Sequence, residues 1–239
     1  MSLLELERVR KRYDDGQLER IVLREVSLQL DAGELAVLWG VRGCGRSTLL
    51  RIAAGIEAPD GGVVRFDGRD LASRGDELLG AGIGYCQKLV QGGSQLALEV
   101  VMMPLLAAGV APARARGRTH EALERVGITA CATLRLSALN TAERVLLSLA
   151  RVLVHDPRLV VVDDPIQGVD LLERDGVLAL LRSLAHGGIA VLASSGDATA
   201  LAGADQTLTL GEGELRGPAL QELAPVVALR RAGGGRAGV

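Results

Sequence analysis

The sequence predicts an α/β fold: a mixed or parallel sheet as the core, an antiparallel β subdomain and a helical subdomain. Continuous apolar runs at residues 35–39, 159–162 and 190–193 are typical of strands that are buried on both faces of a parallel sheet. Alternating apolar and polar residues at 4–9 and 22–30 indicate half-buried antiparallel strands nearer the N-terminus. A long stretch of helical periodicity separates the first buried strand from the last two.

In the first half of the chain, a helix over residues 47–54 directly follows the buried strand at 35–39, and Gly55 closes it. An edge strand with its hairpin is predicted at 63–68, after a turn rich in Gly, Pro and Asp. A short strand is predicted at 83–87.

The helical stretch covers residues 97–153, an insert of about 55 residues, with Gly127 as the C-cap of one of its helices. A helix over 171–185 separates the last two buried strands. The segments 206–210 and 214–215 predict a final hairpin.

The composition supports one globular domain. The chain has 239 residues, 48% of them apolar, and a formal net charge of −2 from 27 Lys and Arg against 29 Asp and Glu. The near-neutral charge argues against a nucleic-acid partner, because phosphate neutralisation needs an excess of Lys and Arg. We expect one domain over 1–228, with the helical subdomain at about 90–157. The Gly- and Arg-rich tail at 229–239 is expected to be disordered.

Cysteine use and hydropathy indicate the compartment. Cys44, Cys86 and Cys131 show the spacing of neither a disulfide framework nor a zinc site, which favours a reducing cytoplasm. The N-terminal segment carries charges every second or third residue and does not resemble a signal peptide. The longest nearly uncharged stretch, residues 100–113, is shorter than the roughly 20 residues that cross a bilayer.

The strongest local motif lies between the first buried strand and the helix that follows it. Residues 40–48 read G-V-R-G-C-G-R-S-T, which matches the phosphate-binding pattern G-x-x-x-x-G-K-[ST] except that an arginine stands at the lysine. In such a loop, backbone N–H groups and the helix N-terminus hold an anion together, and the Ser47 hydroxyl is directed at Mg²⁺. The predicted nucleotide-binding residues of this loop are Gly40, Gly43, Cys44, Gly45, Arg46, Ser47 and Thr48.

Further motifs follow in order, and over residues 4–215 the chain resembles the nucleotide-binding subunits of ABC transporters. Tyr13, placed before the first hairpin, matches the aromatic residue that stacks on adenine in this family. Gln87 matches the Q-loop glutamine that reaches Mg²⁺ and the attacking water. Asp163, at the end of an apolar strand, matches the Walker B aspartate, and residues 168–170 resemble the D-loop.

The resemblance implies a P-loop NTPase core that binds ATP and Mg²⁺, with the metal held by Ser47, Gln87 and Asp163. It implies catalytic roles for Gln87 and Asp164. It also implies a cytoplasmic subunit at the inner face of the cell membrane, bound to a permease and paired with itself or with a second nucleotide-binding subunit. Residues 97–110 are similar to the subfamily that serves lipoprotein-releasing and macrolide-exporter permeases. We expect the permease to dock at residues 100–113, and the alternative for this segment is a plain core helix with a solvated basic end.

Two departures from the family's pattern lie near the phosphate loop. A guanidinium at Arg46 is wider and planar, so we expect it to bind phosphate but to seat it differently from a lysine. Asp164 stands where the family has a glutamate, which draws the carboxylate back by about one C–C bond, roughly 1.5 Å. A general base contributes about 10²–10⁴-fold to a rate, and we expect this displacement to forfeit a large part of it.

Two further departures concern the signature and the switch. Asn140, Thr141, Ala142 and Glu143 stand where the family has its glycine-rich signature. Asn140 can still cap the following helix, whereas the Cβ atoms of Thr141 and Ala142 crowd the approach to a phosphate. Gly196 falls at the position of the switch histidine and offers no side-chain donor.

The altered positions serve turnover, and the retained ones serve nucleotide binding. We therefore expect an ATP-binding subunit that hydrolyses ATP slowly or not at all. One alternative is a pseudoATPase, a structural or regulatory subunit that no longer needs nucleotide. Another is an unimpaired ATPase whose substitutions compensate one another. A P-loop kinase fits less well, because phosphoryl transfer to a small acceptor requires no signature-like helix start and no D-loop.

Overall fold

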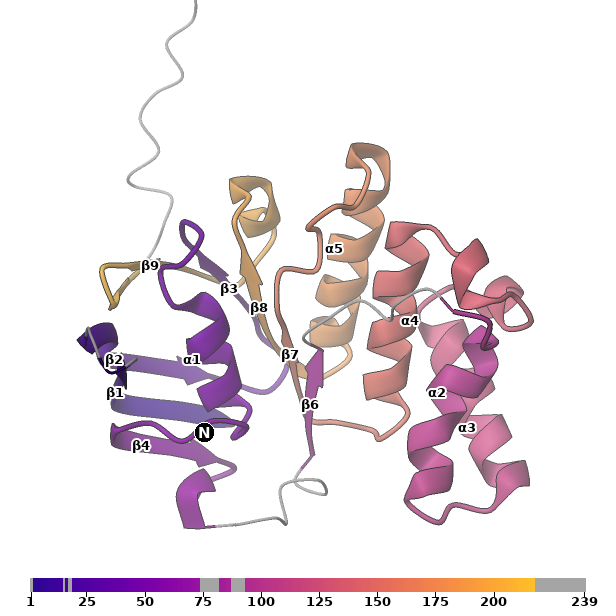
Figure 1. Cartoon of the computed structure of the whole chain (residues 1–239), viewed down its shortest axis with the longest axis horizontal. Coiled ribbons are helices and arrows are strands. Elements are labelled where there is room, and N and C mark those ends of the chain that lie inside the picture. The colour runs from indigo at the N-terminus through magenta and orange to yellow at the C-terminus, as the bar shows by residue number, and fades with distance from the viewer. Residues whose placement is uncertain (1, 15, 17–18, 74–81, 87–92, 218–239) are drawn as a thin grey trace, which may run out of the picture.

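The structure is a computed structural model that describes residues 2–14, 16, 19–73, 82–86 and 93–217. Two sheets form its framework, with one helix between them and four helices on the far side of the larger sheet (Figure 1). The strands are β1 (Leu4–Asp14), β2 (Glu19–Leu30), β3 (Leu35–Trp39), β4 (Gly61–Phe66), β5 (Arg69–Asp70), β6 (Ile83–Cys86), β7 (Leu159–Val162), β8 (Ala190–Ser195), β9 (Gln206–Gly211) and β10 (Glu214–Arg216). The helices are α1 (Arg46–Ala53), α2 (Ala97–Ala107), α3 (Pro112–Arg125), α4 (Thr141–Leu153) and α5 (Leu171–His186), with short 3₁₀ helices at η1 (Leu71–Ser73), η3 (Thr129–Cys131), η4 (Leu136–Ala138) and η5 (Ala198–Leu201).

The smaller sheet is antiparallel, with the strand order β2-β1-β4-β5. Its β1–β2 hairpin pairs Leu4 with Leu30 and Tyr13 with Arg20. Register shifts interrupt the pairing between these ends, as bulges do when they bend a hairpin. Most apolar side chains of the hairpin, Ile21 excepted, are buried in the core shared with α1, so the alternation in the sequence marks the face that packs on the helix.

The structure corrects the expected position of Tyr13. β1 continues through this residue to Asp14, so Tyr13 lies within the first strand and not before the hairpin. The strand was expected to end at Val9 because the following residues are almost all charged. Their side chains are mostly exposed, yet their backbones pair with β2, so the strand continues without an apolar face.

The larger sheet has the order β10-β9-β3-β8-β7-β6, parallel throughout except for the β9–β10 hairpin. Both of its faces are buried. In β7, Leu159 and Val161 pack in the core shared with α1 and the smaller sheet, whereas Val160 and Val162 pack in the core shared with α2 to α5. The expected α/β fold class is confirmed, including the parallel core and both subdomains.

The helical stretch contains α2, α3 and α4, joined by turns and short 3₁₀ helices. Gly127, expected as a C-cap, follows α3 with a φ of 77°, and its N–H bonds to the Glu124 carbonyl. No helix in the described part of the chain is long and apolar enough to cross a membrane. The tail at 229–239 and Gln87 lie outside the described residues.

Candidate functional site

The loop at residues 40–48 connects the end of β3 to the start of α1 and packs closely against its neighbours. Gly45 has a φ of 110°, which only glycine adopts without strain. A Cβ on Gly45 would stand 2.7 Å from Cγ1 of Val22, and a Cβ on Gly40 would stand 2.6 Å from the Leu210 carbonyl oxygen. Both glycines are therefore required for the close approach of the loop to β2 and β9.

α1 begins without a side-chain cap. Gly45 occupies the N-cap position and has no side chain that could accept a bond from the first N–H groups of this helix. Gly43, with a φ of 83°, turns the loop, and the Cys44 N–H donates to the Val41 carbonyl at 3.2 Å. Free N–H groups at a helix start, together with a loop of this shape, form an anion-binding site. The structure thus places residues 40–48 between β3 and α1, and their role in nucleotide binding stays a prediction.

Tyr13 belongs to a group of side chains that we call the tyrosine network: Lys11, Tyr13, Thr48, Arg51 and Glu57. The Tyr13 hydroxyl donates to Glu57 Oε1 at 2.6 Å and lies 3.2 Å from Thr48 Oγ1. Arg51 donates to the Tyr13 hydroxyl at 3.1 Å and to Glu57 Oε2 at 2.9 Å. Lys11 Nζ lies 3.4 Å from Glu57 Oε1 and 5.6 Å from the centre of the Tyr13 ring. The network holds the partly exposed ring of Tyr13 beside the start of α1.

The network also sets the ionisation of its carboxylate. Burial by itself raises the pKa of Glu57, but hydrogen bonds from Tyr13 and Arg51 outweigh burial and hold this pKa below its ordinary value. Glu57 is therefore an anion that pairs with both cations of the network, and Lys11 has a second carboxylate partner in Asp60 at 3.3 Å.

A second group of side chains, which we call the arginine cluster, lies where β7 and β8 end: Arg46, Asp163, Asp164, Ser194 and Gly196. The buried Ser194 hydroxyl donates to Asp163 Oδ1 at 2.7 Å and accepts the Asp164 N–H at 3.1 Å. Asp164 has a φ of 49°, in the left-handed region that non-glycine residues rarely adopt. Parallel strands thus bring three residues that the sequence analysis singled out, Asp163, Asp164 and Gly196, to one edge of the sheet.

Arg46 reaches from α1 to this edge. Its Nη2 lies 3.6 Å from Asp164 Oδ2, and only 11% of its side chain is exposed. Its Nη1 is buried and has no hydrogen-bond partner among the residues that the structure describes. Burial raises the pKa of Asp164, and the positive charge of Arg46 and the Gly196 N–H only partly offset this rise.

The signature-like residues lie apart from the arginine cluster, at the start of α4. Asn140 caps α4 as predicted: its side chain accepts the Glu143 N–H at 2.9 Å, and the Glu143 carboxylate accepts the Asn140 N–H at 2.9 Å. Asn140 Nδ2 also donates to Glu173 at the start of α5. The buried Ala142 and partly buried Thr141 follow the cap. No hydrogen bond or ion pair within the described ranges joins this segment to the 40–48 loop.

Sequence reasoning missed three positioning residues, which are Glu57, Arg51 and Arg174. Glu57 and Arg51 of the tyrosine network carry no motif. Arg174 links two loops, since its Nε donates to the Val169 carbonyl at 3.0 Å and its Nη1 to Asp197 Oδ2 at 2.7 Å. The sequence offers one hint of this link: Asp197 directly follows Gly196, the residue at the switch position.

A fourth missed residue, Tyr85 of β6, has a buried hydroxyl without a hydrogen-bond partner in the described part of the chain. Burial, together with the charge of Asp163, raises the pKa of Tyr85 to about 12. Gln87 follows two residues later and lies outside the described residues, so its predicted role stays a prediction.

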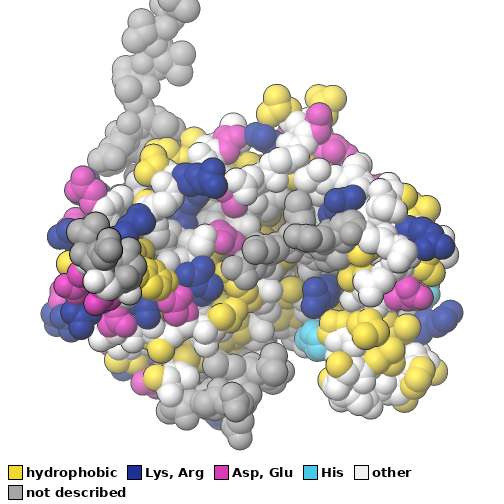
Figure 2. Space-filling view, in the orientation of Figure 1, with side chains coloured by type: hydrophobic (Ala, Val, Ile, Leu, Met, Phe, Trp, Pro, Cys, Tyr) yellow, Lys and Arg dark blue, Asp and Glu magenta, His cyan; other side chains and the backbone are white. Residues whose placement is uncertain are grey.

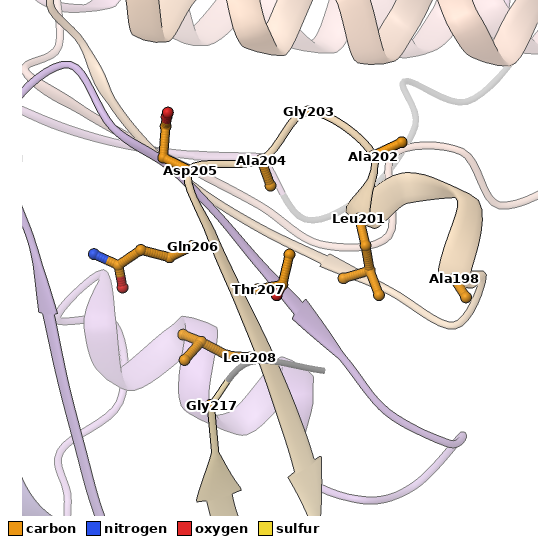
Figure 3. Close-up of a pocket in the computed structure, with 10 residues that line it drawn as sticks. All are labelled: Ala198, Leu201, Ala202, Gly203, Ala204, Asp205, Gln206, Thr207, Leu208 and Gly217. Atoms are coloured by element: carbon orange, nitrogen blue, oxygen red, sulfur yellow. The ribbon is translucent and has the colours of Figure 1, made fainter. Parts of the chain in front are cut away.

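A hollow of about 600 Å³ lies elsewhere, beside η5 and β9 (Figure 3). Leu201, Ala204, Thr207 and Leu208 are among its lining residues. Asp205 and Gln206 also line it, but their side chains are already bonded to backbone and to Glu34. The hollow shares none of its lining residues with the 40–48 loop or the arginine cluster, so we do not assign it to the site.

Comparisons with known proteins identify the family of this chain. A sequence model described as ABC transporter matches residues 23–167. The dimeric structure of MJ0796, a bacterial ABC transporter cassette, is 24% identical, with a TM-score of 0.79 over 89% of this chain and 96% of that chain. The same cassette in a post-hydrolysis state bound to ADP and Pi is 25% identical, with a TM-score of 0.79 over the same shares.

A third structure, cbiO1 from Clostridium perfringens, is part of the ABC transporter complex cbiONQ. It is 23% identical, with a TM-score of 0.81 over 90% of this chain and 87% of that chain. These structures share the fold, and the family match covers more than half of the sequence, including the phosphate loop and the end of β7. The chain therefore belongs to the ABC transporter family, as one of its ATP-binding cassettes.

Proposed function

We propose that this cassette binds MgATP at the 40–48 loop and hydrolyses it slowly or not at all. The observation that carries the proposal is the contrast between two neighbouring carboxylates. Asp163 is oriented by the Ser194 hydroxyl, as a metal-binding carboxylate needs to be. Asp164 has a left-handed backbone, accepts the Gly196 N–H and lies beside Arg46, so the base expected to activate water is already engaged.

The residues around the loop fit a magnesium ion. Ser47 and Asp163 offer hard oxygen ligands, and no group of three or more His, Cys, Asp or Glu in the described ranges forms an all-protein metal site. Mg²⁺ characteristically binds through one or two protein oxygens together with substrate phosphates. We propose that Ser47 and Asp163 hold the ion, with Gln87 as a further ligand. Bound there, Mg²⁺ would neutralise charge on the phosphate oxygens.

Equilibrium binding of a fluorescent ATP analogue with Mg²⁺ tests the first half of the proposal. We expect saturable binding that unlabelled ATP displaces. Asp163→Asn should weaken it at least tenfold when Mg²⁺ is present and much less in EDTA, because the carboxylate acts through the metal. Glu214→Gln, on an exposed hairpin strand, is the matched control. Absence of saturable binding at millimolar nucleotide would contradict the proposal and favour the pseudoATPase scaffold.

Steady-state phosphate release tests the second half. We expect turnover well below the range of about 1–10³ s⁻¹ that is typical of enzymes. The double variant Arg46→Lys/Asp164→Glu should raise it, because a longer carboxylate is then freed from the guanidinium. A native rate inside that range would instead support an unimpaired ATPase with compensating substitutions.

We further propose that the permease binds at the α2–α3 turn. Figure 2 shows hydrophobic side chains gathered over this end of the two helices. Met103 is 56% exposed, Met102, Leu106 and Val110 are partly exposed, and α3 continues with several arginines. The sequence likeness of residues 97–110 to cassettes of lipoprotein-releasing and macrolide-exporter systems supports such a partner. Copurification from native membranes should be lost with Met103→Glu and kept with the control Leu134→Glu, which changes an exposed apolar residue at the opposite end of α2.

We also propose a cassette dimer, formed with itself or with a second cassette, and a location on the cytoplasmic side of the membrane through the permease. Leu171 and Leu172, which follow Asp170, are 74% and 93% exposed, an apolar surface suited to a second subunit. The limits 1–228 for the domain and about 90–157 for its helical subdomain belong to the same proposal. Light scattering with and without MgATP tests the dimer, which Leu172→Asp should weaken.

A further inference from the structure

Gly196 and Arg46 fit one another closely. A Cβ built on Gly196 would stand 3.3 Å from Arg46 Nη1 and 3.5 Å from Nη2. Gly196 is not among the glycines with positive φ, so its backbone conformation does not require glycine. The missing side chain therefore makes room for the guanidinium and does not serve a special turn.

The backbone at Gly196 is fixed on both sides. Its own N–H donates to the Asp164 carboxylate. The next N–H, of Asp197, donates to Ser195 Oγ at 3.0 Å, and the Asp197 carboxylate is bonded to Arg174 at 2.7 Å. A side chain added at position 196 would thus displace the guanidinium more readily than the loop.

The guanidinium has unused hydrogen-bonding capacity. Nη2 faces Asp164, while Nη1 is buried without a partner in the described ranges. A buried N–H of a cation is costly when it stays unpaired, and an anion bound at the loop would satisfy it. Thr48, two residues along the same helix, does not share a face with Arg46 and contacts Tyr13 instead. Tyr13 and Arg46 flank the loop, the first through its contact with Thr48 and the second through its contact with Asp164, so a nucleotide whose base lies at Tyr13 would extend its phosphates toward Arg46.

We propose that Arg46 and Gly196 are a matched pair in which Gly196, as a positioning residue, seats the Arg46 guanidinium so that it contacts the terminal phosphate of ATP. This inference rests on the proposed function and adds to it a specificity: the pair distinguishes a nucleoside triphosphate from a diphosphate. The side chain that distinguishes ATP from ADP is then Arg46 of the phosphate loop, and not a side chain at position 196, directly after β8.

A double-mutant cycle tests the pair, with the native chain, Gly196→Ala, Arg46→Lys and Arg46→Lys/Gly196→Ala measured for ATP affinity, ADP affinity and urea midpoint. Gly196→Ala should weaken ATP about fivefold or more and ADP within about twofold, and should lower the urea midpoint by about 0.5 M. When position 46 is lysine, Gly196→Ala should change ATP affinity by no more than about twofold, because an ammonium group is narrower than a guanidinium and does not extend toward the Cβ added at position 196. Gly211→Ala, where an added Cβ meets nothing within 4 Å, is the matched control.

Equal loss of ATP and ADP affinity, or the same ATP loss in both backgrounds, would overturn the pair. If Gly196→Ala does not fold, the double variant must fold, and its failure to do so would also overturn the pair. If the native chain binds neither nucleotide, the proposed function and the phosphate contact fail together. In that case the urea midpoints still test the packing of Gly196 against Arg46. If the shifts of the two single variants add up to the shift of the double variant, this packing is rejected as well; if they do not add up, the two residues are coupled in the fold but not in nucleotide binding.

Discussion

The tyrosine network and the arginine cluster flank the same phosphate loop but differ in how fully their polar groups are paired. In the tyrosine network, one carboxylate, Glu57, accepts from a hydroxyl and lies against two cations. In the arginine cluster the ion pair is longer, at 3.6 Å, one guanidinium nitrogen is unpaired, and Asp164 holds a left-handed backbone. A closed network of hydrogen bonds fixes a surface in advance, whereas unpaired groups remain available to a ligand. We therefore propose that the loop has one rigid side, formed by the tyrosine network, and one responsive side, the arginine cluster, which would respond to a bound phosphate.

The largest expected effect comes from the loop that separates the two groups. Gly45→Ala should lower the free energy of unfolding by about 3 kcal/mol or more, because it adds backbone strain and a clash with Val22. Urea denaturation followed by circular dichroism measures this change. Gly43→Ala is the matched control: its φ is also positive, but the nearest atom to an added Cβ is 3.8 Å away, so a loss of only about 1 kcal/mol is expected. Equal losses in the two variants would show that packing of the loop on β2 contributes nothing.

The next effect tests the rigid side. Glu57→Gln should cost about 2–3 kcal/mol, because it leaves the partly buried Arg51 without its carboxylate and leaves Lys11 with Asp60 alone. The exposed pair of Glu19 with Arg12 provides the control, and Glu19→Gln should change the free energy of unfolding by less than about 0.5 kcal/mol. A loss as small as that of the control would mean that the tyrosine network is no more rigid than the surface.

A smaller effect tests the support of the responsive side. Arg174→Ala should cost about 1–2 kcal/mol, because it removes bonds to the Val169 carbonyl and to Asp197. It should also weaken ATP more than ADP, since Asp197 fixes the loop that holds Gly196. Arg216→Ala, which removes an exposed ion pair with Glu214, should leave both quantities nearly unchanged. If Arg174→Ala left the ratio of ATP to ADP affinity unchanged, the bonds of Arg174 to Val169 and Asp197 would have no part in the proposed phosphate contact of Arg46.

The smallest effect is a pH dependence of the rigid side. The pKa of Glu57 is lower in the folded chain than its ordinary value of 4.5, so its stabilisation is complete above that pH and is lost as pH falls through the folded pKa. The stability difference between the native chain and Glu57→Gln should therefore shrink progressively below pH 4.5 and stay constant above it. Urea midpoints at a series of pH values measure this difference. A difference that grows on acidification would reverse the sign assigned to Glu57.

The local parts of this molecule are predictable from the sequence, and the long-range ones are not. The 40–48 loop follows from a pattern of glycines between a strand and a helix, and the Asn140 cap follows from its own capping residues. The end of β1 was missed because its backbone pairs without an apolar face. The tyrosine network and the approach of Arg46 to Gly196 join ordinary residues far apart in the chain, and no spacing rule marks such contacts.

β7 has a consequence for how the molecule comes apart. Its four buried side chains alternate between the two apolar cores, so a single short strand is an inner wall of both. Neither core can melt while the other keeps this strand in place, and we expect a single cooperative transition that dissolves both at once. We therefore expect the tyrosine network and the arginine cluster to unfold together, and not one before the other.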